Sequence, residues 1–167
     1  MPKMRVYIDT SVIGGCLDEE FKEASLRLFE EFAKGLKIPL ISEVLIFELD
    51  KAPEKIKEIL NMLENDNVEY VYRDEESDSL AKTYIAEGIL PENSINDARH
   101  IAIATVNRAD VLVSWNFKHI VNLNRIHQVN AVNLKMGYPI LEISRLLKKA
   151  NVGVEDDPDY RRGLDST

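Results

Sequence analysis

Three carboxylates and one amide are the side chains of this sequence whose types and positions could form a catalytic site. Asp9 ends a short run of β-branched and aromatic residues, and Asn116 ends a second apolar run. Asp97 stands at the start of a pattern with helical spacing, and Glu48 lies one to two turns into another. Oxygen ligands of this kind suit Mg²⁺ or Mn²⁺, so the four residues predict a site for a hard divalent cation if the fold brings them together.

The elements that must position these side chains alternate between strands and helices. The strand-like runs are residues 4–9, 37–42, 68–72, 110–116 and 139–143. The helical patterns are residues 21–35, 43–52, 53–66, 74–88, 96–109 and 123–137. Such alternation predicts a three-layer α/β/α sandwich with a doubly wound parallel sheet of about five strands. Ligands of open sheets bind outside the carboxyl ends of the strands, where Asp9 and Asn116 are expected.

The length of 167 residues is typical of one domain with its own core. We predict a domain over residues 1–150 and a loose tail over residues 151–167, where the periodicity ends. No apolar run approaches the roughly 20 residues that span a bilayer, and the first residues pass directly into a strand, so no signal peptide is expected. The single cysteine, Cys16, allows no internal disulfide, which favours the cytoplasm.

The net charge of −8 argues against a broad basic surface for nucleic acid. Binding of RNA to this chain would therefore need bound cations or a local basic patch. Arg99 and His100, together with Lys118 and His119, are the residues that could form such a basic rim. Arg99 and Lys118 could equally be ordinary solvated charges. Trp115 could stack on a base or, as is more common at a strand end, pack in the core.

Each site residue also has a plain structural interpretation. Asp9 precedes Thr and Ser, and Asp97 begins a helix, so either could cap a helix. Glu48 could be a solvent-exposed helix residue, and Asn116 could form an Asx turn after its strand. None of the four is persuasive alone. The functional interpretation rests on their joint placement at one edge of the sheet.

Four segments in this order resemble the PIN-domain family of metal-dependent ribonucleases, and in particular the VapC-type toxins of prokaryotic toxin–antitoxin pairs. The segments are VYIDTSVI, LISEVLIFEL, NDARHIAIA and LVSWNFKHI, and the resemblance covers roughly residues 4–145. It implies a PIN-like fold with an acidic pocket, in which Asp9, Glu48 and Asp97 take the places of the acidic residues that hold Mg²⁺ or Mn²⁺. It also implies cleavage of RNA by a metal-activated water, and a cognate antitoxin as partner.

The sequence departs from the common PIN pattern at Asn116, where many members carry an acidic residue. One branch of the family is similar to this chain in carrying Trp-Asn-x-Lys-His there. An amide oxygen can accept a hydrogen bond from a water molecule, but it brings no negative charge. We therefore expect three carboxylates at the site, Asn116 in a role that orients water, and no firmly held second metal ion.

Other chemistries are less well supported. A zinc site is not indicated, because His100, His119 and His127 lack the spacing of known zinc motifs, and Gly14-Gly15 lacks the pattern of a phosphate-binding loop. A phospho-receiver would have an adjacent acidic pair near the first strand. A phosphatase of the haloacid-dehalogenase type would have Asp-x-Asp where this chain has Asp-Thr-Ser. The remaining alternative is a catalytically degenerate PIN-like module that binds RNA or a partner protein.

The helix predicted over residues 21–35 has apolar positions that we interpret as lying on more than one face. Phe21 and Phe29 are the aromatic residues expected to be exposed there. Exposed aromatic patches mark interfaces, and relatives of this kind are dimers. The sequence interpretation is therefore a homodimeric, metal-dependent endoribonuclease of the toxin type, located in the cytoplasm.

Overall fold

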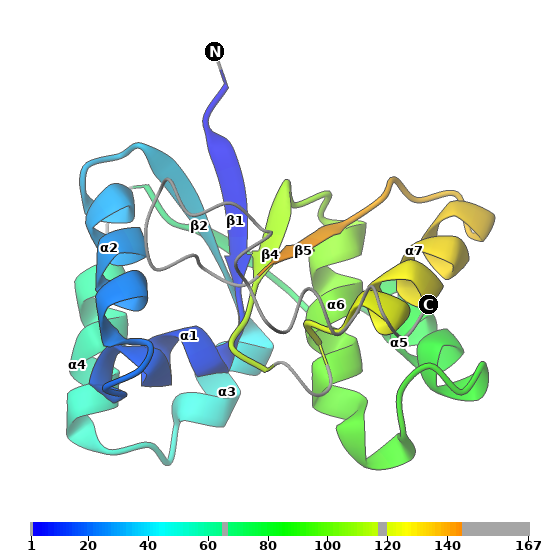
Figure 1. Cartoon of the computed structure of the whole chain (residues 1–167), viewed down its shortest axis with the longest axis horizontal. Coiled ribbons are helices and arrows are strands. Elements are labelled where there is room, and N and C mark those ends of the chain that lie inside the picture. Colours follow the sequence, from blue (N-terminus) through cyan, green and yellow to red (C-terminus); the bar gives the residue numbers. More distant parts are fainter. Residues whose placement is uncertain (1, 65–66, 117–119, 145–167) are drawn as a thin grey trace.

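Five strands form a single parallel sheet at the centre of the molecule (Figure 1). In this computed structural model the strand order is β3-β2-β1-β4-β5, and every neighbouring pair is parallel. The strands are β1 (Met4–Ile8), β2 (Lys37–Ser42), β3 (Glu69–Val71), β4 (Val111–Val113) and β5 (Glu142–Ser144). The chain builds outward from β1 to β3 and then returns to β4 on the other side of β1. The predicted doubly wound parallel sheet is confirmed.

The structure describes residues 2–64, 67–116 and 120–144. The predicted tail over residues 151–167, and the last part of the predicted domain over residues 145–150, lie outside the described residues. The division of the chain at residue 150 therefore stays a prediction.

Helices cover both faces of the sheet (Figure 1). They are α1 (Thr10–Gly14), α2 (Lys22–Ala33), α3 (Glu43–Leu49), α4 (Glu54–Leu63), α5 (Glu75–Ala86), α6 (Ile95–Val106) and α7 (Leu123–Lys135), with two short 3₁₀ helices, η1 (Gly15–Leu17) and η2 (Glu92–Ser94). Helices α1, α2 and α4 lie on one side of the sheet, and α5, α6 and α7 lie on the other. The structure is the three-layer α/β/α sandwich that the alternation predicts.

The two faces of strand β1 contribute to two separate cores. Val6 and Ile8 belong to the cluster packed against α1, α2 and α4, whereas Tyr7 belongs to the cluster packed against α5, α6 and α7. Successive side chains of a strand point to opposite faces, so this division follows from the strand itself. Tyr7 and Ile8 are fully buried. As a result, the centre of the sheet is rigidly held at its carboxyl edge, where the candidate site lies.

Two local features direct the chain at that edge. Ser42 is the last residue of β2, and its side chain accepts a hydrogen bond from the backbone N–H of Leu45 as the N-cap of α3. This cap allows the helix to begin directly after the strand and fixes where Glu48 emerges. Helix α6 is lined by buried small residues such as Ala98 and Ala102, which let it approach the sheet closely.

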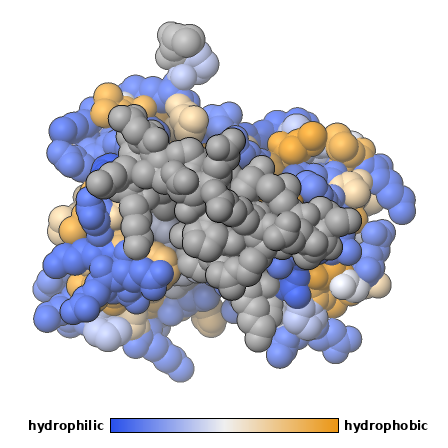
Figure 2. Space-filling model, in the orientation of Figure 1, coloured by the Kyte–Doolittle hydropathy of each residue, from blue (hydrophilic) through white to orange (hydrophobic). Residues whose placement is uncertain are grey.

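The surface does not support the reasoning that led to a dimer. Phe29 is buried, and Phe21 is partly buried and stacks on Trp115 with ring centroids 4.5 Å apart. The expected exposure of Phe29 is wrong, Phe21 is only partly exposed, and Leu26 is the exposed large apolar residue of α2. Figure 2 shows hydrophilic residues over much of the described surface in this view, with apolar surface near the end of α7. No helix within the described residues is long and apolar enough to cross a membrane.

Candidate active site at the carboxyl edge of the sheet

The candidate site lies where the strand order reverses. Strands β1 and β4 are neighbours in the sheet, with Ile8 opposite Val113, and the chain leaves β1 toward one edge of the sheet and β4 toward the other. Open parallel sheets bind ligands at this kind of switch point, outside the carboxyl ends of the strands. Asp9 follows β1 directly, and its backbone N–H donates to the carbonyl oxygen of Val113. Ser114 follows β4 at the same level of the sheet.

The Asp9 carboxylate is buried and held by two hydroxyl groups. Only 3% of the residue is exposed. Ser11 Oγ donates to Oδ1 at 2.6 Å, and Ser114 Oγ donates to Oδ2 at 2.5 Å. Asp9 occupies the N-cap position of α1, but its side chain makes no capping hydrogen bond. The helix-cap interpretation of this carboxylate is therefore wrong, and its orientation is set from both strand ends.

The Asp9 carboxyl interacts with the charges of both His100 and Asp97. Burial raises the pKa of the Asp9 carboxyl, and the negative charge of Asp97 raises it further, while the charge of His100 and the two serine hydroxyls act in the opposite direction. Asp97 lies in the first turn of α6, whose N-cap is Ser94, so Asp97 is not the cap that was considered. The structure thus brings Asp97 close enough to Asp9 for the two charges to interact.

Glu48 reaches the same edge from α3. Its Oε1 accepts hydrogen bonds from Thr10 Oγ1 at 3.1 Å and from His100 Nε2 at 2.6 Å. Burial raises the pKa of the Glu48 carboxyl, but the hydrogen bond and charge of His100, with the Thr10 hydroxyl, outweigh it, and the net effect is a lowered pKa. The Glu48 side chain is 29% exposed. Glu48 is therefore an ionised, partly exposed carboxylate with defined partners, and not a freely solvated one.

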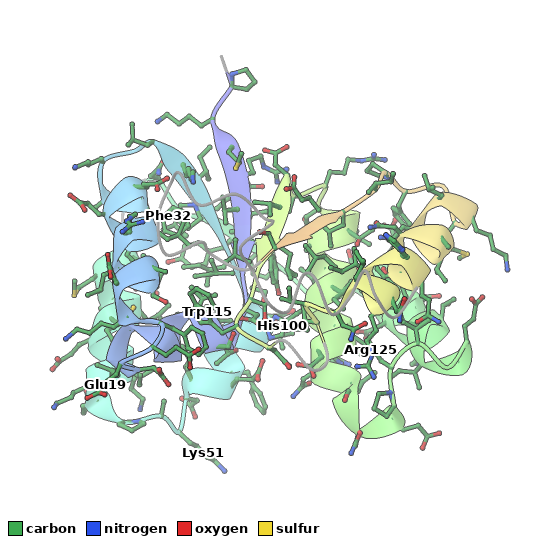
Figure 3. All side chains as sticks on the ribbon, in the orientation of Figure 1. Glu19, Phe32, Lys51, His100, Trp115 and Arg125 are labelled. Atoms are coloured by element: carbon green, nitrogen blue, oxygen red, sulfur yellow. The ribbon has the colours of Figure 1, made fainter. Side chains whose placement is uncertain are left out.

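His100 joins Glu48 to the core of the sheet, and Figure 3 shows His100 near the carboxyl end of β1. Its Nδ1 lies 2.6 Å from the Tyr7 hydroxyl, which lies 2.9 Å from Ser42 Oγ. All three of these residues are buried. The suggestion that His100 belongs to a basic rim is wrong, because the ring is inside the protein with both nitrogens hydrogen bonded.

The segment after β4 is tied to the Asp9 site through its backbone. The N–H of Trp115 donates to Ser11 Oγ at 2.8 Å, and the N–H of Asn116 donates to Ser114 Oγ at 2.9 Å. The Trp115 ring is buried, and its Nε1 donates to Ser25 Oγ at 2.9 Å. Trp115 is thus a core residue and not a platform for a base. Its packing fixes the position of Asn116.

The expected RNA contacts are described only in part. Lys118 and His119 lie outside the described residues. Arg99 is partly exposed, and its Nη1 donates to Asn96 Oδ1 at 2.9 Å. The pKa of Asp78 is lowered mainly by a hydrogen bond from Arg73, and also by the positive charges of Arg99 and Lys82. Three cations from α5, α6 and the end of β3 therefore act on Asp78, which belongs to the acidic first turn of α5.

The donor set suits a hard, hydrated divalent cation. Asp9 is buried, the charge of Asp97 adds to the cost of ionising it, and a bound cation would offset this cost. Within the described ranges, no three His, Cys, Asp or Glu side chains lie together as a group able to hold a metal ion. Mg²⁺ commonly takes only one or two carboxylates and keeps several waters, so the pair Asp9 and Asp97 fits such an ion. The ligand set of Asp9, Asp97 and Glu48 stays a prediction.

Several residues of this site were not found from the sequence. Ser11, Ser114 and Thr10 each contribute one hydroxyl group to a carboxylate, and Tyr7 contributes its hydroxyl to His100. The position of both serines, just beyond a strand end that delivers a candidate residue, was the only signal that could have identified them. The burial of His100 had a clearer signal, because Arg99 is the one charged residue between positions 98 and 105, and a helix that is apolar nearly all round is buried.

Solved structures support the fold. The VapBC2 complex of Rickettsia felis, bound to a DNA fragment from its promoter, contains a chain that is similar at a TM-score of 0.53 and 16% identity, covering 86% of this chain and 100% of that chain. VapC20 of Mycobacterium tuberculosis, a sarcin-ricin loop cleaving toxin, is similar at a TM-score of 0.54 and 11% identity. The match covers 68% of this chain and 92% of that chain. The chain has a PIN-like fold.

A third structure, VapBC-1 from nontypeable Haemophilus influenzae, is similar to the PIN-like chain at a TM-score of 0.51 and 20% identity, covering 85% of this chain and 98% of that chain. No protein-family model matches the sequence, and the search of curated proteins found no match. At these identities the likeness establishes the fold, which confirms the PIN-like architecture expected from the four motif segments.

Proposed function

We propose that this protein is a metal-dependent endoribonuclease of the toxin type, with Asp9, Glu48, Asp97 and Asn116 as its catalytic residues. The observation that carries the proposal is the Asp9 carboxylate. It is buried at the switch point of a PIN-like sheet, held by two hydroxyls, and within range of the charge of a second carboxylate. A purely structural role does not require a buried charge in such a position, because burial of a charge is unfavourable unless it is compensated.

The residues of the chain have separate tasks in this proposal. Asp9 and Asp97 would hold Mg²⁺ or Mn²⁺, with Glu48 as the third carboxylate of the site. Ser11 and Ser114 fix the Asp9 carboxylate from its two sides, which leaves further lone pairs of both oxygens for a ligand. The bound ion would neutralise phosphate charge and activate water for attack on phosphorus. Asn116, whose backbone is anchored to Ser114, would orient water without adding charge.

RNA would approach over the side of the molecule that carries α5 and α6. Arg99 is one of three cations whose charges act on Asp78, and they lie among the acidic residues of the first turn of α5. Positive groups of this kind bind phosphates without reading sequence. We propose that Arg99, Lys118 and His119 contact the RNA backbone.

The structural neighbours suggest the biological setting. Two of them are VapBC complexes, and we propose by analogy that this chain has a cognate antitoxin. A homodimer in the cytoplasm remains part of the proposal, although the buried Phe29 no longer supports it. Light scattering at micromolar concentration tests it, and only monomer would contradict it.

One observation favours a second candidate, a degenerate PIN-like module that binds RNA or a partner protein without cleaving. Asn116 carries no charge where many PIN proteins have an acid, and the described residues contain no three-residue metal cluster. A weaker metal site is the expected consequence. The two candidates therefore differ in whether Mn²⁺ binds and whether RNA is cut.

The test is cleavage of single-stranded RNA by the purified protein with Mn²⁺ and with EDTA. We expect cleavage with Mn²⁺, none with EDTA, and none by Asp9→Asn. Asp50→Asn is the matched control, because Asp50 is an exposed aspartate at the end of α3, and it should cut at the parent's rate. Binding of RNA without cleavage under any of these conditions would favour the degenerate module.

A further inference from the structure

His100 has no assigned role in the proposed chemistry, yet it makes the shortest contact to Glu48. The ring is 2% exposed, and it is the one buried histidine among the described residues. Nε2 lies 2.6 Å from Glu48 Oε1, and Nδ1 lies 2.6 Å from the hydroxyl of Tyr7. A carboxylate only accepts hydrogen bonds, so Nε2 is the donor in this pair.

The other side of the ring is fixed to the sheet. The Tyr7 hydroxyl also lies 2.9 Å from Ser42 Oγ, and Ser42 accepts the capping hydrogen bond from the N–H of Leu45. The rings of Tyr7 and His100 meet edge to face with centroids 5.7 Å apart. The orientation of the imidazole is therefore set by Tyr7 of β1 and Ser42 of β2, both of which are fully buried.

We infer that His100 is a positioning residue that holds the Glu48 carboxylate at the candidate active site through the buried series Ser42–Tyr7–His100. This inference rests on the proposed function of that site. Both hydrogen bonds to the carboxylate, from His100 and Thr10, are made to Oε1. Among the described residues, no protein group donates to Oε2, which leaves that atom for a ligand or a water molecule.

The chemistry explains why a histidine would serve here. Glu48 lies on α3, and its long side chain has several rotatable bonds that solvent alone would not restrict. A donor fixed to the core selects one orientation of the carboxylate, as groups around metal ligands do, and their loss typically lowers metal affinity or activity by about 10- to 100-fold. The arrangement joins four secondary-structure elements, β2, β1, α6 and α3, so it acts at the site and not merely within one helix.

The experiment is a double-mutant cycle on Glu48 and His100. His100→Leu replaces the imidazole with an apolar side chain of similar size and removes its hydrogen bonds to Glu48 and Tyr7. Glu48→Gln removes the negative charge of the carboxylate. We expect His100→Leu to lower kcat on RNA by about 10- to 100-fold with KM unchanged. In the Glu48→Gln background the same substitution should have almost no further effect, because residues that act through one another are not additive.

Two controls separate positioning from a general loss of stability. His127→Leu alters an exposed histidine of α7 and should leave kcat unchanged. Tyr7→Phe removes the hydroxyl that contacts His100, whereas Tyr84→Phe removes a buried hydroxyl that contacts Asn133 instead. Tyr7→Phe should lower kcat and Tyr84→Phe should not, even if both lower the melting temperature equally.

A second measurement, the dissociation constant of Mn²⁺ by calorimetry, distinguishes failure of this inference from failure of the proposed function. If the parent binds Mn²⁺ but does not cut RNA, the proposed ribonuclease activity is refuted. The dissociation constants of Mn²⁺ for the parent, the two single variants and the double variant then still decide the role of His100. Additive effects of His100→Leu and Glu48→Gln, or a parent-like His100→Leu, would overturn the inference. A parent that neither binds Mn²⁺ nor cuts RNA would overturn both.

Discussion

Asp9→Asn should change the stability of the protein in opposite directions with and without a divalent cation. In EDTA the parent must bury the Asp9 carboxylate beside Asp97, which is unfavourable, and burial accordingly raises the pKa of Asp9. The asparagine variant buries no charge, and either hydroxyl partner can still hydrogen bond to the amide. We expect it to be more stable than the parent in EDTA by about 0.5–2 kcal/mol, as is common when a strained functional residue is replaced.

The same linkage gives a pH dependence. The folded-state pKa of Asp9 is raised above its ordinary value of 3.8. Between these two pKa values the folded state binds more protons than the unfolded state, so the unfolding free energy of the parent falls as the pH rises from the lower value to the higher. The advantage of Asp9→Asn in EDTA should therefore grow as the pH rises from below 3.8 and become constant above the folded-state pKa. At a pH well below 3.8, where Asp9 is protonated in both the folded and the unfolded state, the stability advantage of Asp9→Asn that comes from the buried charge should be absent.

Addition of Mn²⁺ should reverse the order. A ligand that binds only the folded state at 100 times its dissociation constant stabilises that state by about 2.7 kcal/mol, and about 2–4 °C of melting temperature corresponds to each kcal/mol for a domain of this size. The parent should thus gain about 5–10 °C, while Asp9→Asn gains little. Thermal unfolding in EDTA and in Mn²⁺ measures both effects, with Asp50→Asn expected to follow the parent. An Asp9→Asn variant that is less stable in EDTA and gains as much from Mn²⁺ as the parent would refute this reasoning.

The remaining predictions concern the neighbouring groups. Asn116→Asp should tighten Mn²⁺ binding by at least about tenfold, or about 1.4 kcal/mol, in calorimetry; no tightening would show that this side chain does not face the ion. Gly15→Ala should lower the unfolding free energy by about 1–3 kcal/mol in urea, because its Cβ would lie 2.5 Å from Trp115 Nε1, whereas Gly14→Ala meets nothing within 4 Å; equal stabilities would contradict the packing. The pKa of Glu48 is lowered from 4.5, so the ionised Glu48 carboxylate contributes stability above that pH, and this stability is lost as the pH falls through the folded-state value. The difference in unfolding free energy between the parent and Glu48→Gln should therefore shrink toward acid pH.

The sequence predicts the fold well, because local patterns and topology agree. Strand β2 coincides with the predicted run at residues 37–42, and Glu48 lies in the helix after it, as expected. Alternation of strands and helices leaves few topologies open, and it places Asp9 at the carboxyl edge of the sheet. These predictions depend on apolar periodicity and on chain order, both of which are visible in one sequence.

The side-chain partners could not be predicted in the same way, because they join residues that are far apart in the chain. Ser114 is 105 positions from Asp9, and His100 is 52 positions from Glu48. A single serine or histidine has no periodicity that could reveal such a partner. The side chain of His100 was therefore interpreted as a surface cation, although its neighbours in α6 are buried.

The prediction of exposed aromatic residues on α2 was wrong for a simpler reason. Ser25, Leu28, Phe29 and Phe32 follow the helical spacing of one face and are all buried, so the apolar residues form a single stripe. Leu26 lies outside that stripe and is 42% exposed. The prediction assigned Phe21 and Phe29 to an exposed face, and a helical projection would have placed Phe29 in the buried stripe.

The most direct test of the account is the rate of RNA cleavage as a function of Mn²⁺ concentration, measured for the parent and for Asp97→Asn under identical conditions. If the carboxylates at the switch point hold the catalytic ion, cleavage by the parent rises with Mn²⁺ to a plateau and disappears in EDTA. Asp97→Asn should be slower by about 1,000-fold, which corresponds to about 4 kcal/mol of transition-state stabilisation. Cleavage that persists in EDTA, or an Asp97→Asn variant that cuts at the parent's rate, would contradict the central claim.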